Sequence, residues 1–178
     1  TFAQPKGRGT NLSSETPNPR GIFDRSTKGV RIEPVSVLVE RGAIRFFAQV
    51  LGETGQIHTD VEAARAAGHP DLVAPPSFFM VIEASANETL RRRGTPAAAA
   101  LVKCDYRYLL HGDERYYYEA PIYAGEEVQF ITRVVDFFDK KGGAMEFVTF
   151  ESSIVHEKRG LLVRSKRTLL HRLPEVKA

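Results

Sequence analysis

The fold is decided by a 17-residue stretch, SFFMVIEASANETLRRR, at residues 77–93. Two prolines come directly before it, and proline is well tolerated in the first turn of a helix. Within the stretch, Phe78, Val81, Ile82 and Ser85 recur at the spacing of one helical face. The stretch therefore predicts a helix whose inner face is unusually apolar.

The chain after this helix is typical of β-structure. Runs rich in β-branched and aromatic residues predict strands at residues 101–110, 115–118, 128–138, 145–156 and 161–172. The KKGG sequence at 140–143 and the KRG sequence at 158–160 are hairpin signals, so the last three strands are expected to be antiparallel neighbours. A long antiparallel sheet must curl and needs cover for its inner face. Only the helix at 77–93 is apolar enough to cover this face. The pattern therefore predicts an α+β hot-dog fold, with the sheet wrapped around one central helix.

The segment before this helix divides into a tail and the start of the domain. Residues 1–29 are rich in Gly, Pro, Ser, Thr and Asn without an apolar period, so we expect a flexible tail, followed by a single domain at 30–178. A short extended run at 32–39 is followed by apolar residues at helical spacing from Ile44 to Leu51, with the helix ending near Gly52. Asp60 is a candidate N-cap for a second helix at 61–67, which Gly68 would end.

Composition narrows the function classes. The formal charge of +3 comes from residues 1–30, which hold five basic and two acidic residues, so the rest of the chain is formally neutral and nucleic-acid binding is not expected. A single cysteine, Cys104, cannot form an internal disulfide, and no apolar stretch reaches the roughly 18 residues of a membrane span. We therefore expect a cytoplasmic protein that does not bind membranes.

A loop between the first two helices carries the main candidate for chemistry. In LGETGQIHTD, residues 51–60, Glu53 lies five residues before His58. A carboxylate and an imidazole on one bent loop can hold a water molecule between them, as the addition of water to a carbon–carbon double bond requires. A surface glutamate near an unrelated loop histidine is the simpler interpretation of the spacing alone.

The same residues resemble the MaoC-type hydratase and dehydratase family, whose motif is Gly-Asp-x-Asn-Pro-x-His. Gly52 to His58 matches this motif in register, with Glu53 in place of the family's Asp and Gly55-Gln56 in place of Asn-Pro. Further segments after His58 also match the family, and they are specific mainly when taken together. They are Asp60, the segment VAPPSF at 73–78, LHG at 110–112 and YAGE at 123–126. The resemblance covers about residues 34–172 and is nearest to the N-terminal-type (HadA-like) half. It implies His58 as base, Glu53 as water-orienting acid, and a 3-hydroxyacyl or 2-enoyl thioester of coenzyme A or acyl carrier protein as substrate.

Other residues are weaker candidates. The segment of Pro76, Ser77 and Phe78 is expected to bind substrate, with the Ser77 backbone N–H as oxyanion donor, although Ser77 is equally well explained as an ordinary helix-start residue. His111 is more typical of a turn, the tyrosines at 116–118 of strand packing, and Cys104 of a small core residue inside a strand. No spacing indicates a metal site, and no cofactor is expected.

Three functions remain open from the sequence. The first is reversible hydration by a MaoC-like dehydratase. The second is a catalytically silent half that binds the acyl chain and pairs with an active subunit. The third is a hot-dog thioesterase, for which Glu83 or Glu88 would supply the carboxylate. Because a single hot-dog leaves a sheet edge unpaired, we expect a homodimer or a heterodimer with a second hot-dog subunit.

Overall fold

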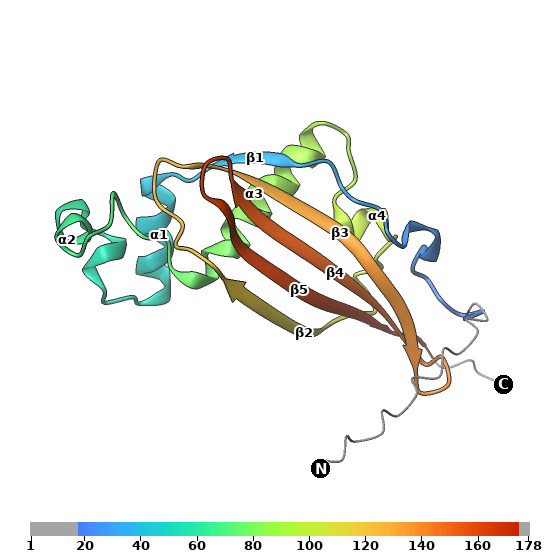
Figure 1. Cartoon of the computed structure of the whole chain (residues 1–178). Helices are drawn as coiled ribbons and strands as arrows, with labels where there is room; N and C mark the ends of the chain where they lie inside the picture. Colours follow the sequence, from blue (N-terminus) through green and yellow to red (C-terminus); the bar gives the residue numbers. More distant parts are fainter. Residues whose placement is uncertain (1–17, 175–178) are drawn as a thin grey trace, which may run out of the picture.

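The computed structural model describes residues 18–174 and consists of a curved antiparallel sheet with one long helix against it (Figure 1). The five strands are ordered β1-β3-β4-β5-β2, and their bounds are β1 (Val35–Leu38), β2 (Leu109–Tyr118), β3 (Glu127–Lys140), β4 (Met145–His156) and β5 (Gly160–Arg172). The α-helices are α1 (Arg41–Leu51), α2 (Val61–Ala66), α3 (Phe79–Arg92) and α4 (Ala98–Leu101). Three short 3-10 turns complete the described elements: η1 (Arg25–Thr27), η2 (Gln56–His58) and η3 (Pro76–Phe78).

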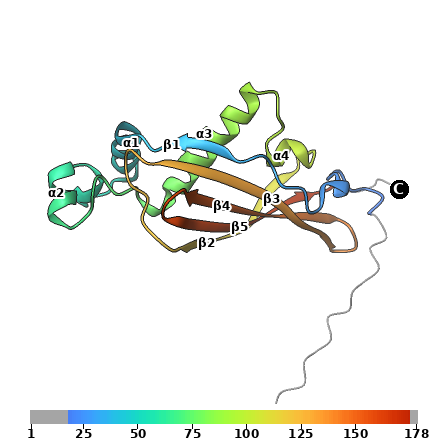
Figure 2. The same ribbon diagram turned by 45° about the horizontal axis from the view of Figure 1, so that its top comes forward.

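Helix α3 is the central helix, and the hot-dog prediction is confirmed. Its buried residues are Phe79, Ile82, Ala86 and Leu90, which follow the spacing of one helical face. This face differs from the predicted one, because Val81 is only partly buried and Ser85 is exposed. The α-helix begins at Phe79, and residues 76–78 form the 3-10 turn η3. The Phe79 ring lies edge-on to Phe130 of β3 and to Tyr116 of β2, at centroid distances of 5.7 and 5.2 Å. Figure 2 shows α3 crossing the sheet, with α1 and α2 gathered beyond one end of it.

The hairpins and the short helices follow local sequence signals. Strands β3, β4 and β5 pair antiparallel in succession, as predicted. The β3–β4 turn uses positive φ at three consecutive positions, Lys141 to Gly143, which explains its two glycines. Asp60 caps α2 by accepting hydrogen bonds from the backbone N–H groups of Glu62 and Ala63. No helix in the described part of the chain has the length and apolar character to cross a membrane.

The predicted strand at residues 101–110 is wrong in its first part. Residues 98–101 form α4 and the following residues form turns, so that β2 begins only at Leu109. Alanine has the highest helix propensity, and the alanines at 97–100 favour the helix over a strand. Cys104 consequently lies in the irregular segment between α4 and β2 and not in a strand. The predicted break at Gly112-Asp113 is a register shift inside β2, where a Cβ on Gly112 would lie 2.9 Å from the Thr168 carbonyl oxygen.

The prediction of a flexible tail is also wrong for residues 18–29. We call these residues the N-terminal strap. Phe23 is only 5% exposed and stacks on His171 of β5 at a ring distance of 3.9 Å. The backbone N–H groups of Ile22 and Phe23 donate to the Glu146 carboxylate at 2.8 and 3.2 Å. The strap is therefore part of the packed fold, while residues 1–17 of the predicted tail lie outside the described residues.

Candidate functional site

His58 ends the 3-10 turn η2 and is held by one short hydrogen bond. Its Nδ1 lies 2.6 Å from the carbonyl oxygen of Val73. Because a carbonyl oxygen can only accept, the Nδ1 atom carries the proton and donates it. The other ring nitrogen, Nε2, then has a free lone pair. In this tautomer Nε2 is the ring nitrogen that can act as a base.

The loop that supplies the Val73 carbonyl is fixed to the elements around it. The Val73 N–H donates to Ile57 O at 3.0 Å, and the Ala74 N–H donates to Ile122 O at 2.9 Å. Directly before them, the Asp71 carboxylate accepts from the Arg41 guanidinium and from the Leu72 N–H, each at 2.8 Å. The hydrogen bond from Arg41 lowers the pKa of Asp71 to about 2. The orientation of His58 thus depends on a loop anchored at both its backbone and its side chain.

Replacing Asp71 with asparagine is expected to lower the melting temperature at pH 7. The pKa of Asp71 is depressed in the folded chain, from an ordinary value of 3.8 to about 2, so its stabilising contribution is present above about pH 4. As the pH falls through the folded pKa, Asp71 is protonated and the contribution is lost. Calorimetry of both proteins from pH 7 to pH 2 should therefore show a gap in melting temperature that closes in acid. A gap of constant size would contradict this role.

His58 opens onto a cavity of about 490 Å³, which we call the His58 cavity. Its walls are mainly apolar, and its lining residues are His58, residues 73–76 from the loop and η3, residues 118–122 from the end of β2 and the segment after it, and Val163 of β5. Of these, only His58, Tyr118 and Glu119 carry ionisable side chains. Burial raises the pKa of Tyr118, and its hydroxyl donates to Pro76 O at 3.0 Å. A small apolar cavity with a few polar groups is typical of ligand-binding sites.

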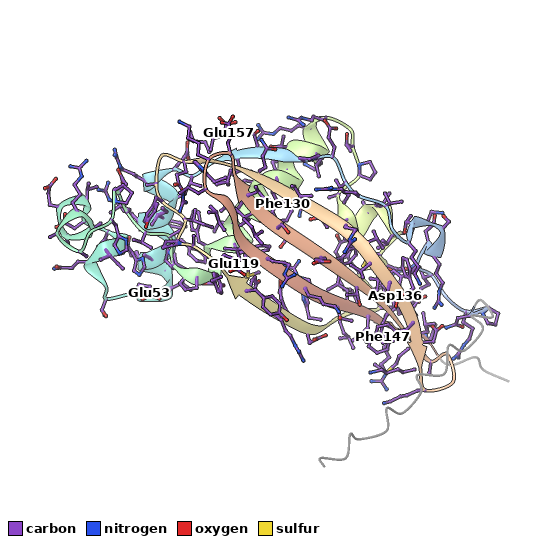
Figure 3. The ribbon with its side chains drawn as sticks, in the orientation of Figure 1. Glu53, Glu119, Phe130, Asp136, Phe147 and Glu157 are labelled. Atoms are coloured by element: carbon purple, nitrogen blue, oxygen red, sulfur yellow. The ribbon has the colours of Figure 1, made fainter. Side chains whose placement is uncertain are left out.

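Glu53, the expected partner of His58, is not among the residues that line this cavity. Its backbone N–H donates to Ala48 O as part of the C-terminal cap of α1, after Gly52 with φ 71°. The Glu53 side chain is exposed and points outward from the lobe that carries α1 and α2 (Figure 3). The structure therefore brings His58 to the cavity but leaves Glu53 outside it.

Glu119 is the carboxylate that the structure places at the His58 cavity, and the sequence analysis missed it. It directly follows β2, with its backbone N–H donating to Leu162 O at 2.9 Å. Figure 3 shows it beside the end of β2. In the sequence, Glu119 stands between an aromatic strand and Ala120-Pro121. Because proline ends a central strand, this position predicts a polar side chain at the margin of the sheet.

The predicted substrate-binding segment is only partly at the cavity. Pro76 lines it, whereas Ser77 and Phe78 do not. As the second residue of η3, Ser77 has a backbone N–H that the turn itself does not use. Phe78 is buried and packs edge-on against Phe47 at 5.6 Å, so it contributes to the core.

The remaining candidates are engaged elsewhere. Both oxygens of Glu83 accept from the Arg167 guanidinium, at 2.9 and 2.6 Å. Arg91 and Arg92 bind Glu88 and lower its pKa to about 2. Burial raises the pKa of the Cys104 thiol to about 11. His111 is exposed on β2. Residues 18–174 contain no group of three or more His, Cys, Asp or Glu side chains that could hold a metal ion.

Comparison with known proteins relates the chain to one family. The family model for the FAS1-like dehydratase domain region matches residues 26–165. The UPF0336 protein of Clavibacter michiganensis subsp. michiganensis is 36% identical over 135 residues, which is 76% of this chain and 85% of that protein. The UPF0336 protein of Streptomyces griseus subsp. griseus is 33% identical over 149 residues, covering 83% of this chain and 93% of that protein.

Solved structures with the same fold include dehydratases. The C-terminally truncated HadBC (3R-hydroxyacyl-ACP dehydratase) complex from Mycobacterium tuberculosis superposes with a TM-score of 0.65 at 19% identity, over 81% of this chain and 96% of that chain. The MaoC-like dehydratase from Rhodospirillum rubrum superposes with a TM-score of 0.62 at 20% identity, over 88% and 100% of the two chains. At these identities the likeness concerns the fold.

Proposed function

The chain belongs to the FAS1-like dehydratase family, and from this premise we propose that it catalyses the reversible hydration of a 2-enoyl thioester in the His58 cavity. The observation that carries the proposal is the short contact between His58 Nδ1 and Val73 O, from which we infer that Nδ1 carries the proton and that Nε2 can accept one. The thioester would be one of coenzyme A or of acyl carrier protein. The HadBC complex, a 3R-hydroxyacyl-ACP dehydratase of the same fold, supports this substrate class.

In the dehydration direction, the proton on C2 of the 3-hydroxyacyl thioester moves to Nε2 of His58. The electron pair of that C–H bond forms the C2=C3 double bond, and the C3–O bond breaks. The carboxyl group of Glu119 transfers a proton to the departing hydroxyl, which leaves as water. His58 then returns its proton to Glu119 through solvent, which balances the cycle. Hydration follows the same steps in reverse.

Charge develops on the thioester oxygen during these steps and needs a donor. The Ser77 backbone N–H is available for this role because η3 leaves it unused, and it follows Pro76, which lines the cavity. Preorganised donors aimed at a developing oxyanion are among the largest contributions to catalysis. The apolar wall formed by Ala74, Ile122 and Val163 suits an acyl chain better than a polar substrate.

This proposal assigns the role of the acid to Glu119, whereas the sequence predicts Glu53 for it. Glu119→Gln is expected to lower the hydration rate by about a hundredfold or more, because the amide cannot transfer the proton. Glu53→Gln, a matched change at an exposed position outside the cavity, is expected to leave the rate unchanged. Initial rates with a trans-2-enoyl thioester, followed by loss of the conjugated absorbance, measure both. If Glu53→Gln lowers the rate and Glu119→Gln does not, Glu53 is the acid.

The outward position of Glu53 favours a second candidate, the catalytically silent half that binds an acyl thioester beside an active subunit. In that case the His58 cavity would bind a labelled enoyl thioester while Glu119→Gln and His58→Ala leave the activity of the assembled complex intact. The thioesterase alternative has less support. A thioesterase needs a free carboxylate to activate water, and Glu83 is held at both oxygens by Arg167.

An exposed edge of the sheet indicates where a partner subunit would bind. Strand β2 lies at one edge of the sheet, ten residues long, with Leu110, Tyr117 and Tyr118 among its exposed apolar residues. A long edge strand with exposed apolar side chains invites pairing with another strand. We infer that a second hot-dog subunit, either a copy of this chain or a different chain, pairs along β2.

Light scattering is therefore expected to give the mass of a dimer for the purified chain or for its co-purified complex. Leu110→Lys should shift the assembly towards the monomer, since it places a charge on the β2 edge. Leu38→Lys is the matched control, because Leu38 is an exposed leucine on β1 at the opposite edge. If the Leu38 variant alone dissociates, the interface lies on β1. A monomer in every preparation would contradict the pairing.

A further inference from the structure

A second cavity lies at the other end of α3 and is larger than the His58 cavity. We call it the distal chamber; its volume is about 680 Å³, room for on the order of twenty water molecules. Its roof is the second half of α3, from Glu83 to Arg91, and its side wall is formed by residues 94–100. Its floor is the inner face of β3, β4 and β5. Alanines at 84 and 97–100 and the glycine at 94 leave this space open, because small side chains cannot fill it.

The two cavities are separate. They share no lining residue. Along the inner face of β5, Val163 lines the His58 cavity and Arg167 lines the distal chamber, while Ser165 between them is buried and lines neither. The edge-on pair of Phe79 and Tyr116 lies in this same intermediate layer. A ligand in one cavity therefore does not reach the other without displacing packed side chains.

The floor of the distal chamber carries a pair of buried hydroxyls. Thr132 of β3 and Ser152 of β4 are each 5% exposed, both line the chamber, and their oxygens are 2.9 Å apart. Only one of the two O–H groups is used in this contact, so the pair keeps one donor and its remaining lone pairs. The remaining O–H group can donate to a ligand that enters the chamber.

The charged side chains beside this pair are already bound to one another. Arg167 is bound by Glu83 of α3 and by Glu114 of β2, so this group of three side chains carries a net charge of −1. The side chains of Arg167 and Glu83 are each 17% exposed, and both line the chamber. Glu88 and Arg91, which also line the chamber, bind each other. A carboxylate placed here would therefore meet cations that are already bound to carboxylates, whereas a hydroxyl can accept from Arg167 or Ser152 and donate to Glu83.

From these features we propose that the distal chamber is a second ligand-binding site, which takes a neutral amphipathic molecule with a hydroxyl group. The hydroxyl binds at Thr132, Ser152 and Arg167. The apolar body packs against the alanine wall and against Phe150 and Leu169 of the floor. This site is independent of the hydration proposed for the His58 cavity.

Titration calorimetry of the full chain with 1-decanol tests the proposal, with decanoate as the anionic counterpart of equal chain length. We expect saturable binding of decanol and at least tenfold weaker binding of decanoate. Thr132→Val, which keeps the side-chain shape and removes the hydroxyl, should weaken decanol binding about fivefold, the equivalent of one net hydrogen bond. Ala97→Phe should abolish it by filling the chamber.

Ala66→Phe is the matched control, because Ala66 is exposed on α2 and lines neither cavity. Decanol binding should be unchanged in this variant and in Val163→Phe, which fills the His58 cavity. If Ala97→Phe does not fold, Thr132→Val still decides the matter. Failure of decanol to bind at its solubility limit, tighter binding of decanoate, or binding lost in Val163→Phe and kept in Thr132→Val would overturn the proposal.

Discussion

Replacing His58 with alanine is expected to lower the hydration of a trans-2-enoyl thioester by at least about a hundredfold, the lower end of what a positioned acid or base contributes. The reason is the hydrogen bond to Val73 O, which fixes the ring and leaves Nε2 as the only ring nitrogen able to accept a proton. The rate is measured by the loss of enoyl absorbance under saturating substrate. His58→Ala should leave the melting temperature close to that of the unaltered protein, because His58 is only half-buried.

A matched histidine provides the control for this variant. His156 ends β4 and accepts hydrogen bonds from the backbone N–H groups of Lys158 and Arg159 in the β4–β5 turn. His156→Asn keeps an acceptor at that position and should hydrate the substrate at the unaltered rate. If both variants lose activity equally, or if His58→Ala loses none, His58 is not the base.

Replacing Glu146 with alanine is expected to lower the free energy of unfolding by about 3 kcal/mol or more, because it leaves three hydrogen-bond donors without an acceptor, and each costs about 1–3 kcal/mol when buried. Glu146 and His171 are both fully buried, and their side chains are 2.8 Å apart. The carboxylate also accepts from two N–H groups of the N-terminal strap. Alanine would leave these donors buried without an acceptor, a situation that costs more than the bond itself contributes. Equilibrium unfolding in urea measures the difference.

Two further variants test whether the loss of stability comes from the buried hydrogen bonds of Glu146 or merely from the removal of a negative charge. Glu146→Gln keeps an oxygen that can accept from the strap, so its loss of stability should be clearly smaller than that of Glu146→Ala. Glu157→Ala removes an exposed glutamate near the β4–β5 turn (Figure 3) and should have little effect on stability. A loss for Glu146→Ala no larger than that for Glu157→Ala would show that the strap does not depend on this carboxylate.

The parts of the fold that were predicted from sequence are those with local signals. The turn at 140–143 needs left-handed backbone, Asp60 caps the helix that follows it, and the apolar face of α3 repeats within one segment. The N-terminal strap has no such signal. Its partner, Glu146, is 124 residues from Ile22 in the sequence, and a single phenylalanine without periodicity does not indicate burial. At Leu101, the first residue of the predicted strand, the helix formed by the preceding alanines continues, and β2 begins only at Leu109.

Of the two residues predicted for catalysis, the structure places His58 at the cavity and Glu53 outside it. The family motif identified His58, because the residue type and its register are visible in the chain. Glu53 was expected beside it on the same loop, but the αL cap at Gly52 turns the chain so that this side chain is exposed. Glu119 comes from the end of β2, which meets the His58 loop only after the sheet has formed. Contacts between segments so far apart in sequence depend on tertiary packing, which spacing within one segment does not reveal.

The central claim is that the His58 cavity hydrates an enoyl thioester. The most direct test is to incubate the unaltered protein, alone and with any subunit that co-purifies with it, with a trans-2-enoyl thioester and to follow the product by mass spectrometry. We expect a product heavier by one water molecule, formed at a rate proportional to protein concentration and lost in His58→Ala. Binding of the thioester without any hydration, in both preparations, would contradict the claim and establish the chain as an acyl-binding half.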